Sequence, residues 1–121
     1  MTGKRILVVD DEREVARALS RLLRRHGFAV ETAHSGEEAL ALLERFDPDV
    51  VLTDYRMPVM NGAEVLRQVS ELRPNAVRLL MSGYTEAAGG MQLGIAHGII
   101  PKPWDSDTLI AMVRGPLGER S

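Results

Sequence analysis

The sequence contains no cysteine, and this absence excludes two kinds of stabilising site. Neither disulfide bonds nor zinc sites built from thiolates can form. Long hydrophobic runs are missing as well, because no stretch approaches the ~20 apolar residues that a transmembrane helix needs. The opening residues MTGKRIL also lack the apolar segment of a signal peptide. We therefore expect a cytoplasmic protein that has no membrane partner.

The charge balance argues against a further class of function. The 121 residues carry a formal net charge of −2, whereas nucleic-acid-binding domains usually present a basic stripe. Hydrophobic residues make up 45% of the chain and charged residues 26%, as in typical soluble globular proteins. The length is that of one ordinary domain. We expect a single domain over residues 1–121 that does not bind nucleic acid.

Short apolar runs alternate with segments of helical spacing along the chain. The runs lie at about 5–10, 28–33, 49–54, 77–82 and 98–101. Between them, apolar residues recur at the spacing of an amphipathic helix. Strict alternation of strands and helices predicts an α/β fold, namely a doubly wound, five-stranded parallel sheet with helices on both faces.

Several helix ends are marked by particular residues. Gly27 stands where a glycine commonly ends a helix. Ser35 with Glu38, and Asn61 with Glu64, have the spacing of a capping box. We therefore expect the first helix to end at Gly27 and the second and third helices to begin at Ser35 and Asn61.

The last two helical segments are less regular. The segment 85–98 includes Gly89, Gly90 and Gly94, and a glycine inside a helix costs about 0.8–1.0 kcal/mol relative to alanine. We expect this segment to be the least stable helix of the domain. Asp105 or Ser106 is expected to cap the last helix. That helix is expected to end at Gly115, Pro116 and Gly118.

Chemically useful side chains follow four of the five predicted strands. They are Asp10 and Asp11 after the first strand, Asp54 after the third, Ser82 after the fourth and Lys102 after the fifth. Because ligands bind outside the carboxyl ends of the strands in such sheets, we expect these groups to meet at one edge. Three adjacent carboxylates repel one another unless a cation is bound. Oxygen ligands of this kind favour Mg²⁺, which also leaves room for phosphate oxygens.

This group of residues fits phosphoryl transfer. A carboxylate can act as the nucleophile toward a phosphoryl group and form an aspartyl phosphate. A cation, an ammonium group and a hydroxyl group can then compensate the charge that the phosphoryl group adds. Positioning and charge compensation are most of what this reaction requires of a protein.

The pattern resembles the receiver (phosphoacceptor) domain of two-component response regulators. The resemblance covers about residues 4–114 and rests on four features in the family's order. They are the pair Asp10–Asp11, the run DYRMPVMNG from Asp54 to Gly62, the tripeptide MSG around Ser82, and Lys102–Pro103. It implies a flavodoxin-like (βα)5 fold with strand order 2-1-3-4-5 and a cis bond between Lys102 and Pro103.

The resemblance also implies a function for each site residue. Asp54 would accept a phosphoryl group from a sensor histidine kinase or a phosphotransfer protein, and Ser82 and Lys102 would contact the phosphoryl oxygens. The domain would be a conformational switch in a phosphorelay, acting on a downstream effector domain or protein, and not a multi-turnover enzyme. Only phosphorylation from donors and autodephosphorylation are expected as its chemistry.

The metal ligands follow from the same resemblance. Asp11 would bind Mg²⁺ directly and Asp10 largely through water, while Asp54 and the backbone carbonyl of Arg56 would complete the protein ligands. Mn²⁺ is a possible substitute. One departure from the family pattern is Ile99, which stands where receivers commonly carry an aromatic residue. We therefore expect the switch to act mainly through residues 85–97.

Three alternatives can be weighed against this interpretation of the sequence. A degenerate receiver would serve as a phosphorylation-independent interaction module, but it would be expected to lack a site residue, and none of the five is missing. A haloacid-dehalogenase-like phosphatase would carry Asp-x-Asp after its first strand, whereas this chain has Asp10, Asp11 and Glu12. A flavodoxin-like FMN-binding protein would need a phosphate-cradling loop there, which these carboxylates would repel.

Overall fold

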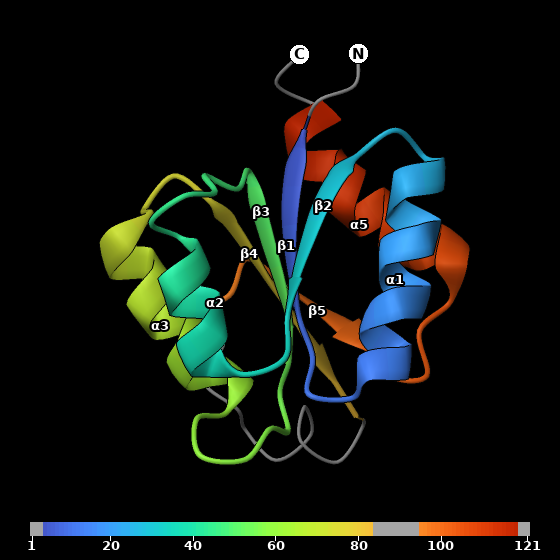
Figure 1. The fold of residues 1–121 in the computed structure, drawn as a ribbon. Helices are drawn as coiled ribbons and strands as arrows, with labels where there is room; N and C mark the ends of the chain where they lie inside the picture. The colour runs from blue at the N-terminus through green and yellow to red at the C-terminus, as the bar shows by residue number, and fades with distance from the viewer. Residues whose placement is uncertain (1–3, 84–94, 119–121) are drawn as a thin grey trace.

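A computed structural model of the chain describes residues 4–83 and 95–118. Its five strands are β1 (Arg5–Val9), β2 (Ala29–Ala33), β3 (Val50–Asp54), β4 (Val77–Ser82) and β5 (Gly98–Pro101). All pairings are parallel and the order is β2-β1-β3-β4-β5 (Figure 1). The described helices are α1 (Arg13–Arg25), α2 (Gly36–Leu42), α3 (Gly62–Leu72) and α5 (Ser106–Gly118). The predicted fold class and strand order are confirmed.

Two hydrophobic cores lie on opposite faces of the sheet, and alternate residues of each strand enter one or the other. Ile6 and Val8 of β1 pack in the core under α1 and α5. Leu7 and Val9 pack in the core under α2 and α3. The helix pairs lie on opposite sides of the sheet (Figure 1). Every residue of β3 is buried, which explains why the central strands read as continuous apolar runs.

The helices begin and end at the capping and helix-terminating residues in the sequence. After α1, Gly27 has a φ of 94°. Its N–H donates to the Arg24 carbonyl at 3.0 Å, and the Phe28 N–H donates to the Leu23 carbonyl at 3.2 Å. These two bonds form a Schellman motif, which ends the helix. Ser35 and Asn61 cap α2 and α3, as predicted.

The last helix differs partly from the expectation. Asp105 caps α5, because its Oδ2 accepts a hydrogen bond from the Thr108 N–H at 3.0 Å. The helix does not stop at Gly115 but continues through Gly115 and Pro116 and ends at Gly118. A Cβ at Gly115 would meet nothing within 4 Å, so no close contact forces the helix to end there. The glycine still lowers the stability of the helix relative to alanine.

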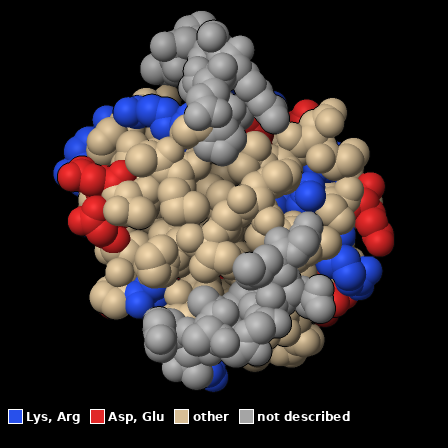
Figure 2. Space-filling view, turned by 180° about the vertical axis from the view of Figure 1, so that it is seen from behind, with Lys and Arg blue, Asp and Glu red and all other residues tan. Residues whose placement is uncertain are grey.

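The expected segment 85–98 lies mostly outside the described residues, so its low stability stays a prediction. Trp104 is half-buried and packs against the core under α1 and α5. Seen from behind, the centre of the molecular face is largely uncharged, and the charged side chains lie toward its rim (Figure 2). No helix among the described residues is long and apolar enough to span a membrane.

Candidate functional site

The carboxyl edge of the sheet brings the predicted site residues together. Asp54 is the last residue of β3 and Ser82 the last residue of β4. Lys102 directly follows β5, and its N–H donates to the Ser82 carbonyl at 3.0 Å. Asp10 directly follows β1, and its N–H donates to the Ala33 carbonyl at 3.0 Å. Backbone hydrogen bonds between neighbouring strand ends therefore fix the backbone positions from which these side chains extend.

Three carboxylates form a cluster at this edge. Asp10, Asp11 and Asp54 each offer an oxygen, and these oxygens lie within 4.8 Å of one another. Asp10 is 1% exposed and Asp54 is 5% exposed, while Asp11 is exposed to solvent. A partly buried set of hard oxygen donors with one solvent-facing member fits Mg²⁺, which usually keeps several of its waters.

The electrostatics of Asp10 also fit a cation. Its Oδ1 accepts a hydrogen bond from the Glu12 N–H at 2.9 Å, whereas its Oδ2 is buried without a partner among the described residues. The pKa of Asp10 is raised to about 6, mainly by burial. The hydrogen bond from the Glu12 N–H lowers this pKa, and the negative charge of Asp54 raises it further. A buried, unpartnered carboxylate oxygen is costly, and a bound cation would remove that cost.

Lys102 holds the other side of Asp54. Its Nζ donates to Asp54 Oδ1 at 2.7 Å, and the lysine side chain is 35% exposed. Burial lowers the pKa of Lys102, but the hydrogen bond and charge of Asp54, together with the charges of Asp10 and Glu12, outweigh burial and raise the pKa overall. Lys102 is therefore an ammonium ion at neutral pH, in direct contact with the carboxylate.

A hollow of about 230 Å³ opens beside this ion pair. It is lined by Asp54, Tyr55, Arg56, Ser82, Gly83 and Lys102. The Ser82 hydroxyl donates to the Gly83 carbonyl at 3.2 Å. The hollow is large enough for a tetrahedral anion and is bordered by an ammonium group and a hydroxyl group. The Lys102–Pro103 peptide bond is cis, as the resemblance implied.

A larger groove of about 570 Å³ lies at the other end of the sheet, where the strands begin. It is lined by Arg5 and by residues 43–49 and 72–76. None of the predicted site residues lies there. Size alone would therefore point to the wrong end of the molecule, because the convergent polar groups are at the carboxyl edge.

Sequence reasoning missed two contacts of the Asp54 carbonyl group. The buried Thr53 hydroxyl donates to the Asp54 carbonyl at 3.0 Å. Gly62 lies so close to the same carbonyl that a Cβ there would be 2.2 Å from its oxygen. A threonine inside an apolar strand gives no sequence signal of this contact. Gly62 is part of the motif that begins at Asp54, but the motif does not say what the glycine touches.

The fold and the acidic edge define a class of protein, and comparison with known families identifies it. The family described as the response regulator receiver domain matches residues 6–114. The chain belongs to this family, whose members are signalling domains of two-component systems.

Two relatives illustrate the similarity. The hydrogenase transcriptional regulatory protein HoxA of Cupriavidus necator is 45% identical over 113 residues, covering 90% of this chain and 23% of HoxA. The response regulator MprA of Mycobacterium tuberculosis (strain H37Rv) is 38% identical over 116 residues, covering 93% of this chain and 50% of MprA. The chain therefore spans half or less of the length of these relatives.

Solved structures agree with the fold. A response regulator receiver domain protein from Clostridium thermocellum superposes with a TM-score of 0.87 at 26% identity, covering 97% of this chain and 96% of that one. The response regulator protein TrrA from Thermotoga maritima, solved in complex with Mg(2+)-BeF, gives a TM-score of 0.84 at 31% identity. That match covers 93% of this chain and 97% of TrrA.

Proposed function

We propose that the chain is a magnesium-dependent phosphoacceptor switch in which Asp54 receives the phosphoryl group. The observation that carries this proposal is the arrangement around Asp54. Its carboxylate contacts the Lys102 ammonium group at 2.7 Å and lies within a cluster with Asp10 and Asp11. Since every expected site residue is present at one edge, the degenerate-receiver alternative is not favoured.

The geometry supports the following reaction. A carboxylate oxygen of Asp54 attacks the phosphorus atom of a phosphohistidine on a sensor kinase or phosphotransfer protein. The new P–O bond forms as the P–N bond breaks, and the leaving histidine nitrogen takes up a proton. The Lys102 ammonium group, which contacts the Asp54 carboxylate before the reaction, then also donates to a phosphoryl oxygen. The Ser82 hydroxyl donates to another phosphoryl oxygen. Both contacts stabilise the charge in the transition state and in the product.

Mg²⁺, or Mn²⁺ in its place, would be held by Asp10, Asp11, Asp54 and the backbone carbonyl of Arg56. When bound, the metal ion supplies positive charge that compensates the phosphoryl oxygens. Asp10 would contribute the oxygen that is otherwise buried without a partner among the described residues. Asp11, which is exposed, reaches the same cluster from the solvent side.

The wider role follows from the family. We propose that residues 1–121 form one receiver domain in the cytoplasm, whose phosphorylation changes its contacts with an effector domain or protein. Apart from accepting and losing the phosphoryl group, no turnover of an external substrate is part of this role. MprA is a response regulator and HoxA a transcriptional regulatory protein, which supports an effector in gene control as one such output.

Intact-protein mass spectrometry after incubation with acetyl phosphate tests the proposal. With Mg²⁺ present, we expect one added phosphoryl group, which base should remove because it is an acyl phosphate. Chelation of Mg²⁺ should prevent the addition. Asp54→Asn should remain unmodified, since an amide is not a nucleophile here. Labelling of Asp54→Asn at the wild-type rate would rule out the assignment.

A further inference from the structure

Gly62, the first residue of α3, lies directly against the backbone of Asp54. A Cβ at this position would be 2.2 Å from the Asp54 carbonyl oxygen, 2.9 Å from its carbonyl carbon and 2.8 Å from Leu80 Cδ1. The first two of these atoms belong to a backbone and cannot rotate away as the end of a side chain can. Any side chain at residue 62 would therefore displace the peptide group that carries the Asp54 carboxylate.

The same carbonyl is held from a second direction. The Thr53 hydroxyl donates to it at 3.0 Å, and the Thr53 side chain is completely buried. The neighbouring peptide is fixed as well, because the Tyr55 N–H donates to the Met81 carbonyl at 2.9 Å. The Gly62 N–H closes the loop by donating to the Tyr55 carbonyl at 2.8 Å. The position of the Asp54 carbonyl is thus set by β3, β4 and α3 together.

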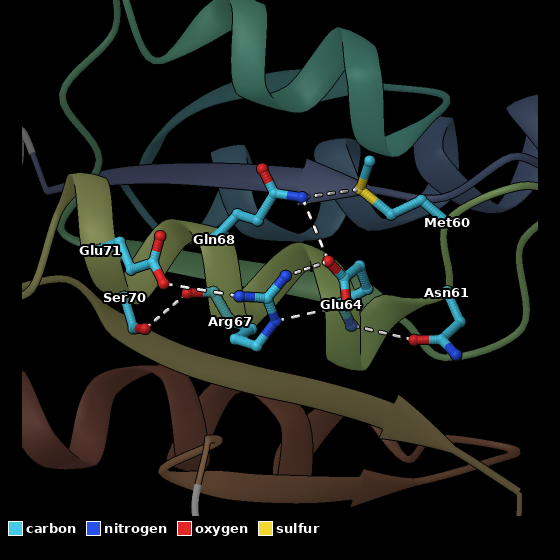
Figure 3. A network of polar contacts seen from close by, with 7 residues as sticks. All are labelled: Met60, Asn61, Glu64, Arg67, Gln68, Ser70 and Glu71. Carbon is cyan, nitrogen blue, oxygen red and sulfur yellow. Dashed lines mark hydrogen bonds and ion pairs between the residues drawn. The ribbon is translucent and has the colours of Figure 1, made fainter.

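Gly62 itself cannot easily move away, because the first turn of α3 is anchored. Asn61 Oδ1 accepts a hydrogen bond from the Glu64 N–H at 2.9 Å, and the Glu64 carboxylate binds Arg67 (Figure 3). Gln68 Nε2 contacts the same carboxylate at 3.2 Å and Met60 Sδ at 4.0 Å (Figure 3). This network joins the end of the loop to the second turn of the helix.

Two groups of the candidate site depend on this peptide. The Asp54 carboxylate is attached directly before this peptide group, and the Arg56 carbonyl lies two residues after Asp54. We propose that Gly62 and Thr53 are positioning residues, which aim the Asp54 carboxylate and the Arg56 carbonyl at a shared Mg²⁺ ion and at the incoming phosphoryl group. This inference rests on the proposed function and adds two residues to its machinery.

Substitution of Gly62 gives the first test, and Gly115 provides the matched control. Gly62→Ala should phosphorylate at least about tenfold more slowly than wild type with saturating acetyl phosphate, since small displacements of reacting groups have effects of this size. It should also bind Mg²⁺ more weakly in isothermal titration calorimetry. Gly115→Ala, which adds the same methyl group where nothing lies within 4 Å, should match wild type in both measurements.

Thr53 gives a second test that separates positioning from stability. Thr53→Val keeps the shape of the side chain and removes the hydroxyl, whereas Thr53→Ser keeps the hydroxyl and leaves a small cavity. We expect Thr53→Val to be the more stable variant but to phosphorylate about fivefold more slowly, the equivalent of one ordinary hydrogen bond. Thr53→Ser should be less stable and nearly as fast as wild type. A purely structural role predicts the opposite order of rates.

The outcomes are distinguishable. Wild-type rates and wild-type Mg²⁺ affinity in a folded Gly62→Ala protein would overturn the role of Gly62. If Gly62→Ala does not fold, the Thr53 pair decides, and equal rates and Mg²⁺ affinities for Thr53→Val and Thr53→Ser would overturn the inference. If wild-type protein takes up no phosphoryl group at all, the proposed function fails. The Mg²⁺ affinities of the same variants then still test the positioning of the metal ligands.

Discussion

Single residues at the carboxyl edge combine burial with charge, and Asp10 does so most strongly. Burial raises its pKa to about 6, against the Glu12 N–H that lowers it. The folded protein therefore holds a proton on Asp10 between about pH 4 and pH 6, where the unfolded chain has lost it. Without a metal ion, the free energy of unfolding should fall as the pH rises through this window.

The variant Asp10→Asn should lose this part of the pH dependence. The pKa of Asp10 is about 6 in the folded protein and 3.8 without the effects of folding. Between pH 4 and pH 7 the free energy of unfolding of wild type should therefore fall by at most about 3 kcal/mol relative to that of the variant. Urea denaturation of both proteins in the presence of a chelator measures it. Glu44→Gln, which changes an exposed carboxylate far from the site, serves as the control. Parallel pH curves for Asp10→Asn and wild type would contradict the raised pKa of Asp10.

A second residue-scale cost lies in the loop after Asp54. Val59 is 97% exposed and has a φ of 72°, and the Met60 N–H donates to the Pro58 carbonyl at 2.7 Å. The chain thus makes a γ-turn around a β-branched residue, which is strained. Val59→Gly should raise the free energy of unfolding by about 1 kcal/mol, after allowance for the greater freedom of glycine in the unfolded chain.

Denaturant unfolding of Val59→Gly checks this expectation. The control is Leu72→Ala, which removes the other large exposed hydrophobic side chain among the described residues and relieves no strain. It should not stabilise the protein. A Val59→Gly variant that is less stable than wild type would show that the turn is not strained at this residue.

At the scale of elements, the helix caps are fixed by short-range chemistry. The Ser35 hydroxyl accepts a hydrogen bond from the Glu38 N–H at 3.0 Å, and the Glu38 carboxylate accepts one from the His34 N–H at 2.9 Å. Ser35→Ala should lower the free energy of unfolding by about 1 kcal/mol. Ser70→Ala, within α3, should be neutral or slightly stabilising because alanine favours helix interiors. Equal effects of the two substitutions on thermal unfolding would argue against the cap.

The junction between β5 and α5 offers a spectroscopic readout. Trp104 is the only tryptophan, lies two residues beyond Lys102 and, like Val15 and Met112, packs against the core under α1 and α5. Its fluorescence should therefore change when Mg²⁺ and beryllofluoride, a phosphoryl mimic, bind and Lys102 shifts its contacts. Asp54→Asn should show no response to beryllofluoride. A wild-type signal that stays constant at saturation, with binding verified by calorimetry, would contradict this coupling.

The elements could be predicted from sequence where local chemistry decides them. The strand that ends at Asp54 begins with a continuous apolar run, residues 50–52, because both of its faces are covered. Gly27 ends α1 because it adopts a positive φ. The passage of α5 through Gly115 was not predicted, since open space around a glycine leaves no trace in the sequence. The contacts of Gly62 and Thr53 with Asp54 were missed for a related reason. The Gly62 contact depends on the approach of α3 to β3, which is a tertiary property. The Thr53 hydroxyl bonds the carbonyl of the next residue, but a threonine can point its hydroxyl elsewhere, and the sequence does not say which orientation it takes.

At the scale of the whole molecule, parallel topology explains how the site forms. Lys102 and Asp54 are 48 residues apart in sequence, yet their side chains meet at 2.7 Å because β5 and β3 end at the same edge. Asp10 reaches the edge from β1, the neighbour of β3 on the other side. The sheet therefore gathers a carboxylate cluster and an ammonium group at the position where such folds bind ligands.

The central claim is that Asp54 is the residue that forms an acyl phosphate. The most direct measurement is to phosphorylate the wild-type protein with acetyl phosphate and Mg²⁺, reduce it with borohydride and locate the altered residue by tandem mass spectrometry. Borohydride reduces an aspartyl phosphate to homoserine and leaves free carboxylates unchanged. We expect homoserine at residue 54 only, and in amounts that follow the extent of phosphorylation. Homoserine at residue 10 or 11, with residue 54 still aspartate, would contradict the account.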